Sequence, residues 1–332
     1  MPHCNFTATL LKWYAEWGRD LPWRHTTDAY AIWLSEVILQ QTRIAQGLDY
    51  WHRFMHRWPR VDDLAAATED EVLRLWQGLG YYSRARNLHT AAQAIVAQGA
   101  FPCTIEGLRA LKGVGDYTAA AVGAMAFGLQ VAAVDGNVYR VLSRHFGIDT
   151  PINTPKAKKE FTTLAQALLP KGQAGTFNQA LMDFGATCCT PKSPRCEDCP
   201  LHCTCEALHS HRVDSLPVKM KTVQVKTRHL QYIYVRCGNE TALRRRPAGD
   251  IWQGLWEPLL VEGTQLPSML GRLTLLRQGV KHVLTHRILF ADFYLLEAEH
   301  KPTLPPDYVW VKETDIDRYA LPRLVEIFLQ SL

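Results

Sequence analysis

The sequence predicts two domains of different classes, an all-α domain followed by a smaller α+β domain. Up to about residue 187 apolar side chains recur at helical spacing, whereas from residue 230 onward short runs rich in β-branched and aromatic residues indicate strands. Between these regions four cysteines stand within seventeen residues, at the spacing C-x6-C-x2-C-x5-C. A chain of 332 residues is long enough for two domains of ordinary size.

The composition is that of a globular protein, with 47% apolar and 21% charged residues. The formal net charge of +5 is compatible with a polyanionic partner but does not identify one. We expect no signal peptide, because the N-terminus has no basic stretch followed by an apolar run, and the apolar stretch 119–134 is too short to span a bilayer. Nine cysteines in such a chain indicate reduced or metal-bound thiols. We therefore expect an intracellular protein with no membrane partner.

The first region reads as a series of short helices. Two apolar runs at i, i+3, i+4 spacing are interpreted as core-facing: Leu10, Leu11, Tyr14 and Trp17, and Trp51, Phe54, Met55 and Trp58. Four residues stand where helix N-caps are expected: Asp62, Thr68, Ser83 and Thr104. Residues 206–228 lose this periodicity and become polar and basic, which predicts a linker. The expected limits are 1–208 for the helical domain, 209–228 for the linker and 229–332 for the second domain.

The second region is predicted to contain strands and two short helices. The expected strands are LQYIYVRC, LLVEG, HVLTHRILFADFYLLEA and YVWVKE. The expected helices lie around Ser268–Leu275 and Pro322–Leu329. The basic run Arg244, Arg245 and Arg246 is expected to face solvent.

The four closely spaced cysteines predict one metal centre. Cys189, Cys196, Cys199 and Cys205 can supply four thiolates, which suits a tetrahedral zinc ion or a [4Fe–4S] cluster. Structural zinc usually has two C-x2-C pairs, and here only the middle pair is that close, so the spacing favours the cluster. Zinc and unrelated cysteines remain the alternatives. The neighbouring Cys188 and Cys203 could also replace one of the four ligands.

The segment LKGVGDYTAAAVGAMAF, residues 111–127, predicts a tight turn that opens directly into a helix. Gly113 and Gly115 allow backbone conformations in which successive N–H groups point outward, toward a phosphate oxygen at the helix N-terminus. With a first helix near 104–110, this forms a helix-hairpin-helix over residues 104–127. Such an element grips the DNA backbone without base specificity. The alternative is a packing joint between two helices.

Asp135, in the segment VDGNV, stands just ahead of a predicted helix. Taken alone it is most simply an N-cap, because Asp is among the preferred residues there. Beside a DNA-binding hairpin and a cysteine-ligated centre, it becomes a candidate catalytic carboxylate.

Together with WLSEVILQQT (33–42) and GLGYYSRARNLH (78–89), these motifs resemble the MutY-type adenine DNA glycosylases. That family belongs to the helix-hairpin-helix superfamily, which it shares with endonuclease III. The resemblance covers nearly the whole chain, more loosely beyond residue 210. It implies a helical glycosylase domain with an iron–sulfur loop at 189–205, then a MutT/Nudix-like domain that recognises 8-oxoguanine. The implied reaction removes adenine mispaired with 8-oxoguanine or guanine in double-stranded DNA. On this resemblance we expect a cytoplasmic monomer, associated with the nucleoid if the source is bacterial.

The resemblance also implies roles for three residues. The target adenine must be flipped out of the duplex before its N-glycosidic bond is broken. Glu36 matches the general acid that protonates adenine N7 and later helps to activate water, and Asp135 matches the carboxylate that stabilises the sugar cation. Tyr117 matches a tyrosine beside these carboxylates. By itself, Glu36 is either an ordinary charge on a helix or an acid that apolar neighbours keep protonated.

Two positions distinguish relatives within the superfamily. Position 117 carries a lysine nucleophile in the bifunctional endonuclease III branch, and it is tyrosine in this chain. Position 139 is also tyrosine, where some adenine glycosylases have a lysine that can be trapped on the sugar. We therefore expect base excision without strong strand cleavage and little trapping by borohydride.

Further matches concern the DNA and the adenine pocket. Gln41 resembles the residue inserted beside the flipped base, and Tyr81 resembles an aromatic wedge next to 8-oxoguanine. The remaining DNA-binding candidates are Gly113, Gly115, Asn137, Arg84 and Arg86, with Arg140 and Arg144 as further phosphate contacts. The candidates for the adenine pocket are Trp23, Arg24, Gln179 and Asp183.

The second domain lacks the Nudix hydrolase box, a glycine followed by a helix bearing R-E-x-x-E-E, so pyrophosphate hydrolysis is not expected. The family's Phe-Ser-His loop corresponds to Leu284, Thr285 and His286, which keeps a hydroxyl and loses the aromatic ring. The alternative is that these residues only end a strand.

Two other functions are compatible with the same motifs. One is a bifunctional glycosylase/AP lyase acting on oxidised pyrimidines, which Tyr117 disfavours. The other is a non-catalytic mismatch-binding protein, which the joint presence of Glu36 and Asp135 disfavours because binding alone requires neither carboxylate.

Overall fold

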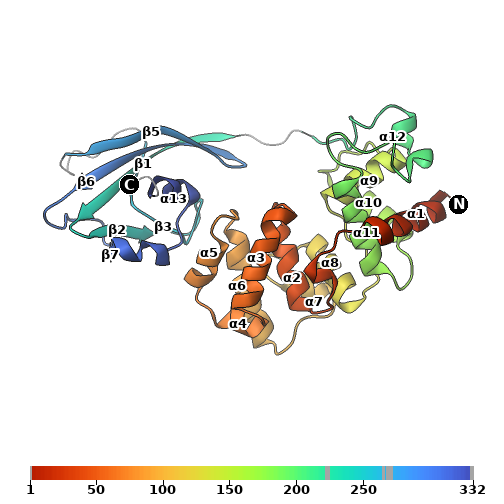
Figure 1. Cartoon of the computed structure of the whole chain (residues 1–332), viewed down its shortest axis with the longest axis horizontal. Coiled ribbons are helices and arrows are strands. Elements are labelled where there is room, and N and C mark those ends of the chain that lie inside the picture. Colours follow the sequence, from red (N-terminus) through yellow and green to blue (C-terminus); the bar gives the residue numbers. More distant parts are fainter. Residues whose placement is uncertain (1, 221–224, 264–265, 267–271, 330–332) are drawn as a thin grey trace. The chain divides into compact units, whose positions relative to one another are not determined.

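The computed structural model describes residues 2–220, 225–263, 266 and 272–329 (Figure 1). For residues 2–5 only the backbone is described. The chain divides into two compact units, residues 1–65 with 90–221 and residues 66–89 with 222–332. Helices fill the first unit and a mixed sheet fills most of the second, as predicted. No helix among the described residues is long and apolar enough to cross a membrane.

The α-helices follow one another with short breaks, and the longer ones carry the core. Their bounds are α1 Pro2–Trp17, α2 Ala29–Leu39, α3 Ile44–Arg57, α4 Val61–Ala66, α5 Glu69–Trp76, α6 Ser83–Ala97, α7 Ile105–Ala110, α8 Asp116–Phe127, α9 Gly136–Phe146, α10 Pro155–Leu168, α11 Ala174–Thr187, α12 Glu206–His209 and α13 Arg323–Leu329. Short 3-10 helices cover Pro22–Arg24, His202–Thr204 and Glu313–Arg318.

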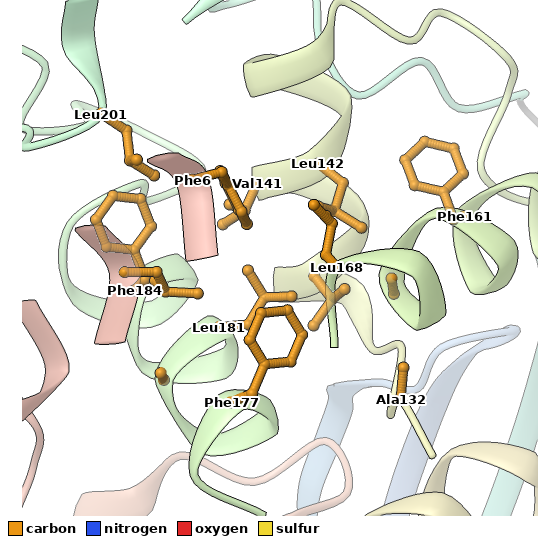
Figure 2. Packing of buried hydrophobic residues seen from close by; sticks show 14 of the residues in the cluster. Phe6, Ala132, Val141, Leu142, Phe161, Leu168, Phe177, Leu181, Phe184 and Leu201 are labelled. Atoms are coloured by element: carbon orange, nitrogen blue, oxygen red, sulfur yellow. The ribbon is translucent and has the colours of Figure 1, made fainter. Parts of the chain in front are cut away.

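One apolar core holds α1, α9, α10 and α11 together (Figure 2). Phe6, Phe161, Phe177 and Phe184 meet in it, each at most 2% exposed. Cys188 belongs to the same core, and Cys189 and Cys199 pack against it, so the cysteine loop is tied to these helices.

Three predicted helix starts are confirmed and two are wrong. Thr68 and Thr104 cap α5 and α7 with their hydroxyls, and the Asp135 carboxylate accepts the Val138 N–H at the start of α9. Asp62 lies instead inside the first turn of α4, and Ser83 is the first residue of α6. Both are still near a helix N-terminus, where acidic and hydroxyl side chains are favoured for related reasons.

The helix-hairpin-helix consists of α7, a tight turn and α8. Gly113 has φ +80°, in the left-handed region that favours glycine. Gly115 has an ordinary φ of −92°, so the expectation of a special conformation is wrong there. A Cβ at Gly115 would meet nothing within 4 Å, which leaves open space in front of the α8 N-terminus for a ligand.

The second unit is built on a seven-stranded sheet in the order β3-β2-β1-β6-β5, with β4 paired to β1 and β7 paired to β2. Strands β1 and β6 run parallel, and the other pairs are antiparallel. The strand bounds are β1 Lys226–Cys237, β2 Glu240–Arg245, β3 Trp256–Glu257, β4 Leu259–Glu262, β5 Thr274–Val283, β6 Arg287–Glu297 and β7 Tyr308–Lys312.

Several details of the sheet differ from the prediction. The long run at 282–298 is two strands joined by a turn, not one strand. The helix expected around Ser268–Leu275 is wrong at its end, where β5 begins at Thr274; residues 267–271 lie outside the described part. Strand β2 was not predicted, although its Gly238-Asn239 connection to β1 is a typical two-residue hairpin signal.

The helix predicted at the C-terminus is confirmed as α13, which packs on the sheet. The Phe328 ring stacks on Phe293 of β6 at 4.2 Å between centroids. The basic run before the 249–252 loop alternates in exposure: the side chain of Arg245 is 42% exposed, whereas that of Arg246 is 3% exposed. The expectation that all three arginines face solvent is therefore wrong for Arg246, because alternate strand residues point to opposite faces.

We expect Phe177→Ala to destabilise the protein by about 3–5 kcal/mol, since it removes a fully buried ring and leaves a cavity. The matched control is Val96→Ala, at a side chain 40% exposed, which should cost well under 1 kcal/mol. Chemical denaturation followed by circular dichroism measures both. Equal costs for the two variants would contradict the assigned core.

Candidate functional site

Two carboxylates from different helices meet in one cavity of the first unit. Glu36 lies on α2, a helix with ten of its eleven residues buried, and Asp135 precedes α9. Tyr117, from the first turn of α8, lies between them and interacts electrostatically with both. The cavity of about 360 Å³ is large enough for a nucleobase. Its lining is Arg19, Leu21, Trp23, Arg24, Glu36, Leu39, Thr42, Arg43, Ile44, Tyr117, Met125, Asp135, Asn137, Gln179, Met182 and Ala186.

The environment of Glu36 favours its protonated form. Burial raises the pKa of this carboxyl to about 7, and a hydrogen bond with Tyr117 opposes the shift only in part. The negative charge of Asp135 raises the pKa further. Glu36 is therefore a group that can give up and regain a proton near neutral pH.

The hydroxyl of Tyr117 connects Glu36 to a methionine. It donates a hydrogen bond to the Met182 Sδ at 3.0 Å and also shares a hydrogen bond with Glu36. Since the hydroxyl has one proton, it can donate to only one of these two acceptors at a time. When it donates to Glu36 it favours the carboxylate, which is why this bond offsets part of the rise in pKa that burial causes.

Asp135 serves as a helix cap and faces the cavity at the same time. One carboxylate oxygen accepts the Val138 N–H and the other accepts the Asn137 amide, both at 2.8 Å. Burial raises the pKa of Asp135, and these two hydrogen bonds partly offset that rise. Both oxygens are thereby fixed in direction.

A chain of hydrogen bonds runs from Asp135 to the cysteine loop. The Asn137 side-chain oxygen accepts from Arg140 at 2.8 Å, and Arg140 donates to the carbonyls of Cys189 and Gly185 at 2.7 Å. Close packing makes this possible, because a Cβ at Gly185 would come within 2.6 Å of the Asn137 Cβ. Asn137 was expected to bind DNA. Its amide nitrogen and its amide oxygen both make hydrogen bonds within this chain instead.

Three of the four residues expected in the adenine pocket line the cavity, and the fourth does not. Trp23, Arg24 and Gln179 lie on its wall. Asp183 is fully buried instead and accepts hydrogen bonds from Arg24 at 2.6 and 2.7 Å and from Arg19. Burial alone would raise its pKa, but the hydrogen bonds from Arg24 and Arg19 outweigh it and lower the pKa. Asp183 is therefore a charged anchor for the pocket arginines.

Sequence reasoning missed two neighbours of this pocket. Tyr14 was interpreted as a core residue, yet its hydroxyl donates to the Gln179 side-chain oxygen at 2.9 Å and its ring lies under Arg24. Met182 was not singled out. The helical spacing of Gln179, Met182 and Asp183 on α11 is the signal that could have grouped them.

The expected metal ligands line a second cavity, beside the core of the first unit. Cys189, Cys196, Cys199 and Cys205 all contribute to it, as does Cys188. Cys203 is exposed and is absent from its lining, so the structure excludes it as a substitute ligand. Among the described residues no three His, Cys, Asp or Glu side chains converge on a single ion. Four thiolates around one cavity suit a cubane cluster, in which each of four irons takes its own thiolate.

Arg140 and Arg144, expected at DNA phosphates, are buried beside this cavity. Arg144 is 3% exposed, and its guanidinium lies 3.5 Å from the Cys189 sulfur and 2.7 Å from the Thr190 carbonyl. Arg140 is 8% exposed. The prediction of phosphate contacts is therefore wrong for both, since their donors are directed at groups inside the unit, among them the Cys189 and Thr190 carbonyls.

Two residues expected to enter the DNA helix share an unusual backbone. Gln41 has φ +60° and Tyr81 has φ +46°, and both side chains are exposed. Left-handed backbone is uncommon for residues other than glycine, and such strain is often found at functional positions. Arg84 is buried instead, donating to the Leu79 and Gly80 carbonyls, with its pKa lowered to about 10 by burial. Arg86 donates to the Gln253 carbonyl.

In the second unit the segment 284–286 forms the tip of the β5–β6 hairpin. The Leu284 N–H donates to the Arg287 carbonyl at 2.8 Å, which closes the turn. Leu284 packs against the apolar cluster under the sheet, whereas Thr285 and His286 are exposed. The Tyr81 hydroxyl, which belongs to the same unit, lies 2.6 Å from the Thr285 hydroxyl.

Comparison with known families gives three matches along the chain. Residues 34–167 match the HhH-GPD superfamily of base excision DNA repair proteins, and residues 189–202 match the iron–sulfur binding domain of endonuclease III. Residues 231–331 match the NUDIX domain. The iron–sulfur match begins at Cys189, which favours Cys189 over Cys188 as the first ligand. The chain therefore has an iron–sulfur domain, and its four-cysteine spacing fits a [4Fe–4S] cluster.

The individual proteins that resemble this chain are also DNA glycosylases. An adenine DNA glycosylase of Mus musculus is 45% identical over 213 residues, 61% of this chain and 41% of that protein. One of Buchnera aphidicola (subsp. Acyrthosiphon pisum) is 33% identical over 254 residues, 76% of this chain and 73% of that protein. A solved thermostable thymine-DNA glycosylase has a TM-score of 0.59 at 32% identity, covering 63% of this chain and 97% of that one. The chain spans about two fifths of the length of the mouse relative.

Replacing the buried acid should change how stability depends on pH. The pKa of Glu36 is about 7 in the folded state and near the ordinary 4.5 when unfolded, so the folded state loses stability as pH rises from about 4.5 to 7. Glu36→Gln removes this loss and should be more stable than the parent by about 1–3 kcal/mol at pH 8, with little difference at pH 4.5. Denaturation midpoints at both pH values measure this. A difference independent of pH would contradict the assignment.

Proposed function

The chain belongs to the adenine DNA glycosylase family, and on that premise we propose that it hydrolyses the N-glycosidic bond of adenine in double-stranded DNA. The observation that carries the proposal is a buried acid with a pKa of about 7, Glu36, facing a second carboxylate across a cavity of nucleobase size. Two carboxyl groups in environments that favour different protonation states are the arrangement that glycosidic bond hydrolysis requires.

Glu36 supplies the proton. At neutral pH a carboxyl with a pKa near 7 is substantially protonated and can transfer its proton to a ring nitrogen of the bound adenine, which makes the base a better leaving group. After the base departs, the resulting carboxylate accepts a proton from the attacking water. The hydrogen bond between the Tyr117 hydroxyl and Glu36 then forms again.

Asp135 stabilises the positive charge that develops on the sugar. Its two oxygens are held by the Val138 N–H and the Asn137 amide, so no reorganisation is needed when the charge appears. The adenine itself is proposed to bind against Trp23, Arg24 and Gln179, with Asp183 holding Arg24 in place.

The lining of the cavity favours excision without strand cleavage. Among the described residues that line it, none is a lysine, so the cavity wall offers no side-chain amine that could attack the sugar carbon. Tyr139 packs its ring on Phe161 in the core and does not line the cavity. The bifunctional glycosylase/lyase is the second candidate function.

The preferred substrate is proposed to be adenine opposite 8-oxoguanine, with adenine opposite guanine as a weaker one. The exposed Thr285 and His286 carry polar groups that can bond the oxidised guanine, while Leu284 is turned inward. Tyr81 is proposed to wedge beside that base, Gln41 to fill the gap of the flipped adenine, and the 113–115 turn to hold a phosphate.

The protein is proposed to act as a monomer with a glycosylase domain at 1–208 and an 8-oxoguanine recognition domain at 229–332. They are joined by a linker at 209–228, whose last three residues already belong to β1. The [4Fe–4S] cluster would be held by Cys189, Cys196, Cys199 and Cys205. Bound there, it would crosslink the segment from Cys189 to Cys205, and base hydrolysis transfers no electrons. We propose a cytoplasmic location.

Single-turnover excision tests this reaction. We expect Glu36→Gln to lower adenine release by about 10²–10⁴-fold while leaving DNA binding in place. The parent rate should fall tenfold per pH unit above about 7, as Glu36 loses its proton. Glu16→Gln on the exposed end of α1 is the matched control.

The duplexes carry adenine opposite 8-oxoguanine, adenine opposite guanine, or thymine glycol, each assayed with and without alkali. Breaks that form only after alkali support a monofunctional enzyme. Alkali-independent cleavage at thymine glycol would instead identify a lyase, and binding without turnover would identify a mismatch-binding protein.

The cysteine assignment predicts iron content. Cys199→Ser should lose iron and sulfide, whereas Cys203→Ser should keep both, since Cys203 does not line the cavity. Metal analysis of the purified variants measures this. Zinc in place of iron, or loss of iron on changing Cys203, would overturn the ligand assignment.

A further inference from the structure

A network of ion pairs lies behind the β5–β6 hairpin of the second unit. Its centre is Asp250, which accepts hydrogen bonds from three arginines on different segments. Arg228 of β1 donates at 2.6 and 3.0 Å, Arg246 at 2.7 Å, and Arg287, the first residue of β6, at 2.9 Å. Charge-assisted bonds of this kind are among the strongest in proteins.

Asp250 is the member of this network that connects the hairpin to the rest of the sheet. Arg228 also pairs with Glu262, and Arg246 also pairs with the fully buried Glu257. Arg287 has Asp250 as its ion-pair partner among the described residues. Burial alone would raise the pKa of Asp250, but the hydrogen bonds from the arginines outweigh it and hold that pKa well below the ordinary value, so the carboxylate stays charged.

The loop that carries Asp250 has strained backbone. Trp252 has φ +60°, a rare conformation for a bulky side chain, and Gly249 has φ +91°. The Trp252 ring contacts the His282 ring of β5 edge-on at 5.8 Å and packs in the same apolar cluster as Leu284. Strain of this kind persists only where the surrounding contacts impose it.

The loop 249–252 therefore contacts both strands of the hairpin, through Trp252 on β5 and through Asp250 on β6. The tip between them presents Thr285 and His286 to solvent. A recognition tip on two strands of a sheet edge needs support from behind, because its contact groups have to be held within about 0.5 Å of the productive geometry.

We propose that Asp250 is a positioning residue for recognition of the base opposite the excised adenine, acting through Arg287 on the 284–286 tip. The proposal rests on the proposed function of that tip. Asp250 touches neither the DNA base nor the reacting atoms, and its effect is on selectivity between opposing bases and not on the excision chemistry in the first unit.

Single-turnover excision by the full-length protein tests this, with adenine opposite 8-oxoguanine and opposite guanine. Asp250→Asn keeps the shape of the side chain, and Arg228 and Arg246 retain Glu262 and Glu257 as partners. We expect the ratio of the two rates to fall roughly tenfold, with excision opposite guanine unchanged. Asp307→Asn, at an ion pair with Arg244 whose aspartate is 52% exposed, is the matched control and should leave the ratio unchanged.

Arg287→Gln and the double variant show whether the effect passes through Arg287. We expect the same fall in the ratio for Arg287→Gln and no additional fall in the double variant, as for two residues of one pathway. Equal losses on both substrates, or a normal ratio in Arg287→Gln, would overturn the proposal. If Asp250→Asn does not fold, Arg287→Gln decides alone.

Thr285→Ala separates this proposal from the function on which it rests. If Thr285→Ala lowers the ratio and Arg287→Gln does not, the tip recognises the base and the positioning role is wrong. If Thr285→Ala leaves the ratio unchanged, recognition by this tip is itself wrong.

Discussion

The burial of a single carboxyl group, that of Glu36, is the constraint on which the first unit depends. A carboxylate taken out of water is costly unless it is neutralised, so a site that buries it also raises its pKa. The surrounding helices make that burial possible. Helix α2 is apolar on nearly all sides, and α8 brings a run of small residues, Ala119 to Ala124, against it. Small side chains let the two helices approach closely, which places Tyr117 beside the acid.

The second carboxylate is placed by backbone geometry and not by apolar packing. Asp135 ends an extended segment and caps α9, and the same hydrogen bonds that start the helix fix the direction of both oxygens. From there Asn137 and Arg140 reach the carbonyl of Cys189. The helix start, the cavity and the cysteine loop are therefore joined by one continuous chain of hydrogen bonds.

In the second unit, the constraint is the support of an exposed hairpin tip, residues 284–286. Polar residues at the end of a hairpin have few neighbours, so their precision comes from what lies behind them. Here it comes from an aspartate shared by three arginines and from a strained loop packed on β5. Leu284 faces the apolar cluster, which leaves Thr285 and His286 as the polar groups available for contact.

The sequence alone determined the fold class and the order of the two domains, because both are encoded in short-range pattern. It also predicted the cysteine ligands from their spacing and the two catalytic carboxylates with the help of a family resemblance. Helical periodicity, the C-x6-C-x2-C-x5-C spacing and the N-cap at Asp135 depend only on neighbours along the chain. Tertiary structure decided everything that depends on burial. Arg84, Arg140 and Arg144 look like surface charges in the sequence, and only packing shows that their donors point inward.

The same limit explains the other differences. Asp183 lies one turn from Gln179 on α11, so sequence placed both at the pocket, while the ion pairs with Arg19 and Arg24 that bury it join segments some 160 residues apart. The strand β5 was missed at its start because its side chains are mostly exposed and show no alternation. Asp250 gave no signal in the sequence, since two of its three partners, Arg228 and Arg287, lie 22 and 37 residues away along the chain. Long-range electrostatic pairs are a property of the folded chain, and no local pattern contains them.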